Sequence, residues 1–198
     1  MPISSDRALS PHPNTPSTLA AASASALASA QANNTSDPPA DFTRFEGRAA
    51  FAQACKQMLQ TAKAENWPRL TLCDHDFKNW PLSDADFVQG LEDWSHSGRQ
   101  FLIVAGDYRV IEAEFPRFVR WRRQWDHIVQ AVAVAPAHRG SGMPSVILGG
   151  GWALHRVDAE RERGYLSHEA APVHQLQEVL DEMLLKAHSA FPASTIGL

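Results

Sequence analysis

The chain has 198 residues, enough for one domain with a hydrophobic core, and carries a net charge of −4 with a pI near 6.1. This acidic balance excludes a general attraction to nucleic acid or anionic membranes, so any such binding requires a local basic patch. Its two cysteines, Cys55 and Cys73, indicate neither a disulfide framework nor a structural zinc site. We therefore expect a reducing, cytoplasmic location. No apolar run approaches the roughly 20 residues that a membrane-spanning helix needs.

The first 41 residues consist mainly of Pro, Ser, Ala, Thr and Asn. With so few large apolar side chains, such a segment cannot bury enough surface to offset the chain entropy lost on folding. The run TLAAASASALASAQA ends in small residues, as a signal-peptide cleavage site does, but lacks a basic start and a strongly apolar middle. We expect a disordered tail over 1–41 and a folded domain over 42–198.

From Phe42 onward, helical and extended patterns alternate. In FEGRAAFAQACKQMLQTAKAEN (45–66), apolar residues recur every three or four positions, which predicts an amphipathic helix. Trp67 and Pro68 end that helix, because a residue before proline disfavours helical backbone angles. The run RLTLCD (69–74) predicts a short β-strand.

The next predicted elements are two helices and two strands. SDADFVQGLEDWSH opens with Ser83 as the expected N-cap and Asp86 three residues later, a pair similar to a capping box. The apolar run QFLIVAG (100–106) is typical of a parallel strand buried on both faces. A second helix is expected over Val110–Trp125, and then an extended segment, HIVQAVAVAP (127–136).

The last third of the chain contains hairpin signals and a closing helix. PSVILGGGWALHRVD (144–158) predicts two strands about a glycine turn. DAERERG (158–164) predicts a solvated turn, and YLSH (165–168) a short strand. APVHQLQEVLDEMLLKAHSAF (171–191) predicts an amphipathic helix with Pro172 in its first turn. Strands separated by helices predict an α/β domain whose mixed, mostly parallel sheet is flanked by helices.

Two motifs have both a ligand-binding and a simpler interpretation. ILGGGWALH lacks the residues of a Walker loop and the spacing of a dinucleotide fingerprint, so a hairpin turn is favoured. CDHDF offers Cys73, His75 and a carboxylate to a metal, but no second cluster has matching spacing. A turn with side-chain-to-backbone hydrogen bonds is favoured there. We expect no metal and no cofactor.

Four segments carry a family resemblance: LTLCDHDFKNWPL, FLIVAGDY, PRFVRWRRQWDH and WALHRVDAERERG. They are similar to a poorly characterised bacterial family with a phospholipase D-like fold, whose members occur alone or behind an N-acetyltransferase domain. The resemblance covers Phe45–Phe191. It implies that this region is one half of a phospholipase D-like α/β domain.

The resemblance also concerns catalysis. The superfamily signature is His-x-Lys-x4-Asp, in which the His is the nucleophile or acid, the Lys binds phosphate and the Asp orients the His. The corresponding positions here hold Pro144, Val146 and Gly151, which lack those functions. Two halves are usually needed, and a homodimer could supply the second half but not the missing side chains. The resemblance therefore implies a degenerate site with no catalytic residue.

The segment PRFVRWRRQWDH (116–127) concentrates four arginines and two tryptophans. At about 100° per residue on a helix, its residues separate into two faces. The apolar stripe comprises Phe115, Phe118, Trp121, Trp125 and Ile128. The opposite side carries Arg120, Arg123 and His127, and the borders carry Arg117 and Arg122. The tryptophans are therefore expected in the core, not among exposed cations as in a single-strand-binding surface.

Two interpretations of these arginines stay open. In one, they are a solvated face whose border members cover apolar surface or pair with nearby carboxylates. In the other, Arg117, Arg120 and Arg123 form an anion-binding edge for a nucleotide, a phospholipid head group or an acidic protein partner. The sequence thus leads to a non-catalytic binding or regulatory module as the first hypothesis. The alternative is a phosphodiesterase-like enzyme with an active site outside the usual signature.

Overall fold

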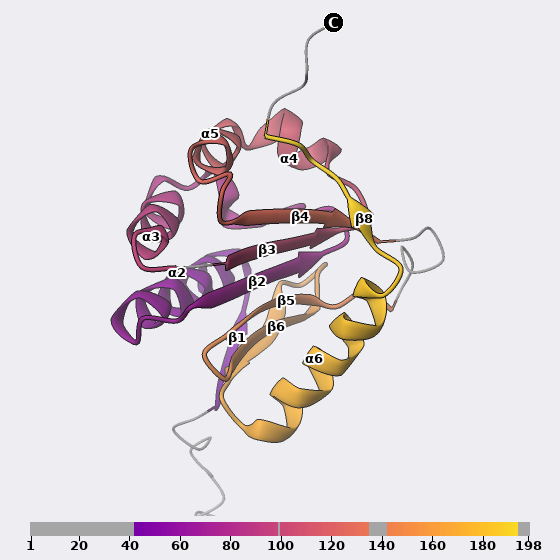
Figure 1. Ribbon diagram of the computed structural model, residues 1–198. Helices are drawn as coiled ribbons and strands as arrows, with labels where there is room; N and C mark the ends of the chain where they lie inside the picture. The colour runs from indigo at the N-terminus through magenta and orange to yellow at the C-terminus, as the bar shows by residue number, and fades with distance from the viewer. Residues whose placement is uncertain (1–41, 99, 135–141, 194–198) are drawn as a thin grey trace, which may run out of the picture. The chain divides into compact units, whose positions relative to one another are not determined.

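A computed structural model describes residues 42–98, 100–134 and 142–193 (Figure 1). The tail expected over 1–41 lies outside these residues. The helices are α2 (Arg48–Ala64), η1 (Pro81–Ser83), α3 (Ala85–Ser95), α4 (Arg109–Glu114), α5 (Pro116–Gln124) and α6 (Ala170–Leu184). The strands are β1 (Phe42–Glu46), β2 (Arg69–Asp74), β3 (Gln100–Ala105), β4 (Val129–Ala133), β5 (Ser145–Gly149), β6 (Trp152–Asp158), β7 (Arg163–Ser167) and β8 (His188–Ser189). None of the described helices is long and apolar enough to cross a membrane.

The strands form one mixed sheet in the order β1-β7-β6-β5-β2-β3-β4-β8. In this described sheet, β2–β3 and β3–β4 are parallel and the other five pairings are antiparallel. The prediction of a mostly parallel sheet is therefore wrong. Parallel neighbours need a crossover of about a dozen residues or more, and such crossovers, through α3 and through the α4–α5 pair, connect β2 to β3 and β3 to β4. The short turns between β5, β6 and β7 reverse the chain and make those pairs antiparallel.

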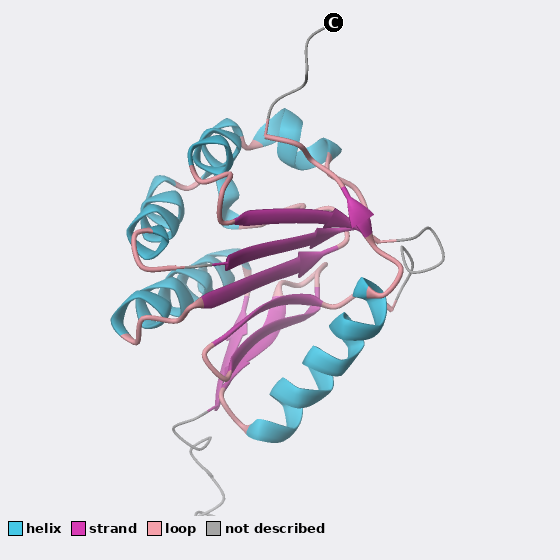
Figure 2. Cartoon of the chain, viewed as in Figure 1, coloured by secondary structure: helices cyan, strands magenta, loops and turns pink. Residues whose placement is uncertain are grey.

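Both faces of the sheet are buried, as the alternation along its central strands shows. Leu72 of β2 and Ile103 of β3 belong to a core cluster with side chains of α2, α3, α4 and α5. Their neighbours Cys73 and Val104 belong to a second cluster with α6. Helix α6 therefore covers one face and the other helices cover the opposite face (Figure 2). This confirms that QFLIVAG forms a strand buried on both sides.

The predicted glycine hairpin is confirmed. Gly150 and Gly151 join β5 to β6 with φ of 55° and 81°, the left-handed region that tight hairpin turns require. A Cβ atom at Gly150 would lie only 2.0 Å from the Trp67 ring, so this position also needs glycine for space. The register then sets Ile147 opposite Leu154 and Val146 opposite His155.

The helix expected over Val110–Trp125 is interrupted at Phe115. Pro116 begins α5, and Phe115 has a ψ of 60°, outside the helical range. Proline lacks an N–H group and restricts the residue before it, so one continuous pattern becomes two helices. The expected N-cap is displaced by one residue, because Asp84 rather than Ser83 accepts the capping hydrogen bond of α3.

Two predicted helices are shorter than expected because their ends join the sheet. The start of 45–66 belongs to β1, and Gly47, with a φ of 87°, separates that strand from α2. The closing helix ends at Leu184, and β8 forms at the opposite edge of the sheet. Pairing with β7 and β4, which the local pattern does not encode, decides both outcomes.

Candidate functional site

A cleft of about 770 Å³ opens at the carboxyl end of β2. Its walls come from the loop after β2, the start of β5, the strands β6 and β7, and helix α6. The lining residues are Asp74, His75, Asp76, Lys78, Asn79, Gly142, Met143, Pro144, Ser145, His155, Arg156, Val157, Ala159, Glu160, Tyr165, Gln175, Leu176 and Val179. The cleft therefore combines titratable side chains with an apolar wall from α6.

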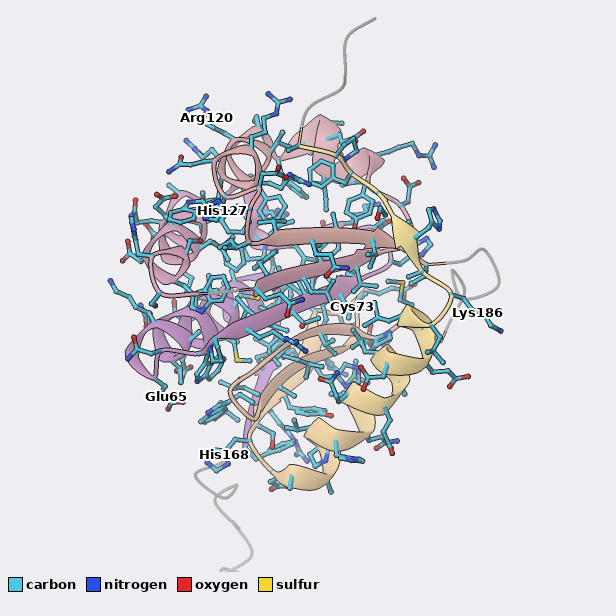
Figure 3. All side chains as sticks on the ribbon, viewed as in Figure 1. Glu65, Cys73, Arg120, His127, His168 and Lys186 are labelled. Carbon is cyan, nitrogen blue, oxygen red and sulfur yellow. The ribbon has the colours of Figure 1, made fainter. Side chains whose placement is uncertain are left out.

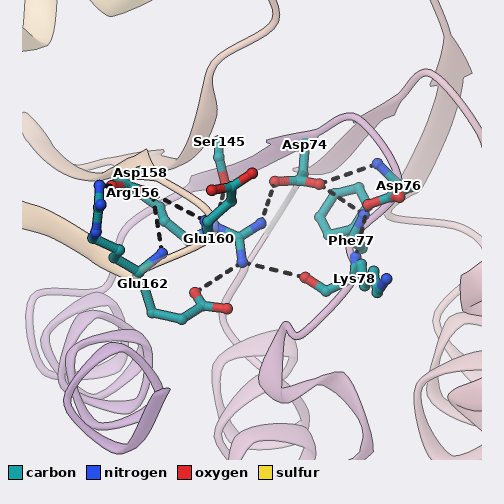
Figure 4. A network of polar contacts seen from close by, with 10 residues as sticks. Asp74, Asp76, Phe77, Lys78, Ser145, Arg156, Asp158, Glu160 and Glu162 are labelled. Carbon is teal, nitrogen blue, oxygen red and sulfur yellow. Dashed lines mark hydrogen bonds and ion pairs between the residues drawn. The ribbon is translucent and has the colours of Figure 1, made fainter. Parts of the chain in front are cut away.

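The buried guanidinium of Arg156 is the centre of a polar network beside this cleft (Figure 4). Its Nη2 donates to Asp74 Oδ2 at 2.9 Å, and its Nη1 donates to Glu162 Oε2 at 3.0 Å. Its Nε donates to Ser145 Oγ at 2.9 Å, and Nη1 also reaches the Lys78 carbonyl at 3.2 Å. Each nitrogen of this guanidinium thus donates to a protein oxygen, which leaves it little capacity to bind a phosphate.

The CDHDF segment forms the turn that the sequence predicts. Asp74 Oδ1 accepts hydrogen bonds from the backbone N–H groups of Asp76, at 3.1 Å, and Phe77, at 2.8 Å. Cys73 is buried in the cluster with α6, where burial raises the pKa of its thiol well above the ordinary value, whereas His75 is exposed. Within the described ranges, no group of three or more His, Cys, Asp or Glu is arranged to hold a metal ion. The hydrogen bonds of Asp74 thus hold the turn that follows β2.

The charges around the cleft do not suit an anion. Asp74, Asp76 and Glu160 line it with three carboxylates, whereas Lys78 and Arg156 supply two permanent cations. With neutral histidines, these described lining residues sum to a formal charge of −1. The lining residues therefore provide no excess of positive charge for a phosphodiester.

His155 is the half-buried imidazole of the cleft. Its Nδ1 lies 3.3 Å from the hydroxyl of Tyr165, the residue opposite it on β7. Burial lowers the pKa of His155 and raises that of Tyr165. The imidazole is therefore neutral near pH 7, the form that a general base or nucleophile requires.

The three positions aligned with the phospholipase D signature do not converge. Pro144 lines the cleft. Val146 is fully buried in the core cluster beneath α6. Gly151 lies in the β5–β6 turn, at the far end of β5 from Pro144. Gly151 is therefore separated from the other two positions by the length of β5.

Helix α5 separates its aromatic and basic residues as the helical projection predicts. Phe118 and Trp121 are buried in the core, and Trp121 Nε1 donates to Ser95 Oγ at 3.2 Å. Trp125 is only half-buried, and its Nε1 donates to Glu92 Oε2 at 2.8 Å. The expected core stripe is therefore confirmed for Phe118 and Trp121, whereas Trp125, at the end of the helix, is less buried.

The arginines of α5 lie in two different environments. Arg117, Arg120 and Arg123 are exposed, and Arg120 projects from the outer side of α5 (Figure 3). Arg122, expected on the border, is buried and pairs with Asp126, as the interpretation of a border arginine paired with a nearby carboxylate predicts. Its burial involves tertiary contacts such as the Phe191 ring, 5.6 Å from the guanidinium carbon, which a helical projection cannot show.

A groove of about 340 Å³ lies between α3 and α5. Its lining residues are Ala85, Val88, Gln89, Glu92, Arg117, Arg120, Trp121 and Gln124. Arg117 Nη1 donates to the Ser83 carbonyl at 2.8 Å. The groove thus brings together two of the three predicted anion-binding residues, and Arg123 lies outside it.

The pairing of Arg156 with Glu162 is not predicted by the sequence pattern. That pattern assigns Glu162 to a solvated turn, but this residue is buried and compensates Arg156, so the expectation is wrong. The alternation of β6 carries the signal that could have found the pair. Arg156 is two residues from the buried Leu154 and therefore on the same inward face, where a cation needs a partner.

Comparison with known proteins gives structural neighbours only. No family model matches the chain, and no curated protein sequence matches it. TrmBL2, described as an archaeal chromatin protein with a novel mode of DNA binding, superposes with a TM-score of 0.54 at 12% identity. The match covers 87% of this chain and 62% of that chain, so the present chain spans less than two thirds of TrmBL2.

A second neighbour is NucT from Helicobacter pylori, with a TM-score of 0.48 at 8% identity over 75% of this chain and 98% of that one. At such identities, the similarity to TrmBL2 shows a shared fold alone. The chain is thus an α/β domain with a mixed sheet flanked by helices, a fold that also occurs in TrmBL2.

Proposed function

We infer that this chain is a non-catalytic binding domain with a degenerate phospholipase D-like fold, and that the arginine face of α5 binds an anionic ligand. One observation carries the proposal. Arg117 and Arg120 line a single groove, and neither forms an ion pair with any residue in the described part of the chain. Arg123, on the same helix, likewise has no such ion pair.

The contrast with the cleft supports this assignment. Arg156 is enclosed by Asp74 and Glu162, so its charge is compensated within the protein. In the α3–α5 groove, Glu92 is the one carboxylate among the lining residues. Its two oxygens already accept hydrogen bonds from Gln124 and Trp125. Glu92 therefore does not occupy the donors of the two arginines, and Arg117 keeps those that do not bond the Ser83 carbonyl, so both can donate to an oxyanion.

We choose a nucleic acid as the first ligand to test. TrmBL2 shares the fold, and its description states that it binds DNA. The groove and Arg123 form a local basic patch on a chain of net charge −4, so binding should be weak and strongly dependent on salt. A phospholipid head group and an acidic protein partner offer the same anionic chemistry.

The test is a fluorescence anisotropy titration of a labelled DNA duplex at several salt concentrations. The variant Arg120→Glu with Arg123→Glu should bind about tenfold more weakly or worse, and the salt dependence should fall. Its melting temperature should match that of the native chain, because both side chains are exposed. The matched control carries the same charge change at Arg48 and Arg69, which are also exposed, and should keep the affinity. Equal loss in both variants, or no DNA binding by the native chain, would contradict the proposal.

The enzyme hypothesis has one supporting observation, the neutral His155 beside Tyr165 in a cleft of about 770 Å³. Its test uses the native chain and His155→Ala with bis(p-nitrophenyl) phosphate as the substrate. We expect no turnover, because the lining residues carry a net negative charge and the signature positions hold no nucleophile. Robust turnover that His155→Ala abolishes would overturn the binding-module proposal.

A further inference from the structure

A pocket of about 430 Å³ lies at the outer edge of the sheet, where β8 stops covering β4. Strand β8 pairs with β4 at Val132 and Ala133, and Ala190 N–H donates to the Ala131 carbonyl at 3.0 Å. The pocket lies beside this contact. Its lining residues are Arg122, Val129, Gln130, Ala131, Ser189, Ala190 and Pro192. None of these residues lines the α3–α5 groove, so the two sites are distinct.

Arg122 is the charged residue of this pocket, and its side chain is only 6% exposed. Its Nη1 donates to Asp126 Oδ1, the carboxylate one helical turn later. That carboxylate is 61% exposed, so water competes for it and it compensates the buried cation only in part. The Phe191 ring lies 5.6 Å from the guanidinium carbon and adds a cation–π contact.

The other edge of the guanidinium has no acceptor among the described residues. Nε of Arg122 is buried and has no hydrogen-bond partner, and Nη2 donates to no described residue. Nε and Nη2 form the side-on fork of an arginine, the pair of N–H groups that matches the two oxygens of a carboxylate. A buried charged group normally has its donors satisfied, because leaving them unpaired is costly.

We propose that Arg122 and this pocket form a binding site for a small carboxylate with an apolar body. Nη2 of Arg122 donates to one carboxylate oxygen, and a shift of the guanidinium opens the enclosed Nε to the second oxygen. The side chains of Val129, Ala131, Ala190 and Pro192 provide apolar walls for the remainder of the ligand. The volume suits a small organic acid, whereas a nucleic acid strand is too large to enter it.

The experiment compares benzoate with benzamide, its neutral isostere, by calorimetric titration and thermal shift on the full chain. Benzoate should bind and raise the melting temperature, whereas benzamide should do neither. Asp126→Asn removes the competing carboxylate from an exposed position without disturbing the core. This variant should bind benzoate about fivefold more tightly, because one nearby negative charge is lost.

Two further variants test whether the bound carboxylate lies at Arg122 and not on the arginine face of α5. Arg122→Gln should lose benzoate binding, and Asp126→Asn keeps the test decisive if Arg122→Gln fails to fold. The variant with Arg120→Glu and Arg123→Glu should bind benzoate like the native chain, so failure of the DNA proposal leaves this one intact. Equal responses to benzoate and benzamide, or an Asp126→Asn affinity at or below the native value, would overturn the proposal.

Discussion

Arg156 on β6 and Asp74 at the end of β2 are 82 residues apart in the sequence, yet Nη2 and Oδ2 lie 2.9 Å apart. The side chains are 3% and 5% exposed, respectively. Strand β5 lies between β2 and β6 in the sheet, and Ser145 at its start accepts a hydrogen bond from the same guanidinium. Arg156 therefore ties three strands together at the edge of the cleft.

Removing this arginine should destabilise the fold strongly. Arg156→Met leaves Asp74 and Glu162 buried without their cation, and we expect it to lower the free energy of unfolding by about 3–5 kcal/mol. Urea unfolding followed by circular dichroism measures the loss. Adding Asp74→Asn and Glu162→Gln removes the uncompensated charges and should recover part of it. If this triple variant is no more stable than the single variant, buried charge is not the cause.

Restoring the lysine of the phospholipase D signature should destabilise the fold rather than create an enzyme. Val146→Lys puts an ammonium group in the apolar cluster beneath α6, and we expect a loss of about 3 kcal/mol or more. Val157→Lys is the matched control, because Val157 is 64% exposed on the neighbouring strand. The control should cost within about 0.5 kcal/mol in the same urea assay. Equal costs for the two variants would contradict the placement of β5.

The two tryptophans of PRFVRWRRQWDH should differ in their contribution to stability. Trp121 is 3% exposed and contacts Phe101 and Phe118, so Trp121→Ala should cost about 3–5 kcal/mol. Trp125 is half-buried at the end of α5, so Trp125→Ala should cost less than half as much. Denaturant unfolding monitored by far-ultraviolet circular dichroism gives both values. The reverse order would show that the helix is rotated from the orientation described.

His155 should make stability depend on pH. Burial lowers its pKa in the folded state below the ordinary value near 6.5, so the unfolded chain binds the proton more readily. The free energy of unfolding should therefore fall as the pH drops below about 6.5, until the pH reaches the folded-state pKa. His155→Gln should remove this part of the slope. The comparison is urea unfolding of both proteins from about pH 5 to 7.5, and identical slopes would contradict a half-buried, neutral imidazole.

Local patterns in the sequence predict much of the element order. The run QFLIVAG forms the predicted strand, and Gly150 and Gly151 form the predicted hairpin turn. Backbone preference and burial agree at those positions. The apolar stripe of α5 is correct through Phe118 and Trp121 for the same reason. The spacing of apolar residues, every 3.6 residues in a helix or every two in a strand, is a local property of the sequence, so each of these segments can be predicted without knowing its distant partners.

Other features depend on partners that are distant in the sequence. FTRFE becomes β1 because β7, more than a hundred residues later, offers it a ladder of hydrogen bonds. Glu162 is buried because Arg156 needs a second carboxylate, although the mixed charges around it are typical of a solvated turn. In both cases a long-range partner outweighs the local preference.

The sequence by itself determined the alternation of helices and strands, the two-sided burial of the strand QFLIVAG and the separation of tryptophans from arginines on α5. These follow from spacing within single segments. Only the tertiary structure decided that the sheet is mostly antiparallel, that Arg156 is compensated, and that Arg122 faces a pocket while Arg117 and Arg120 share a groove. The physical reason is that the free energy of a charged side chain depends on its burial and its partners, and strands and helices from across the chain supply both.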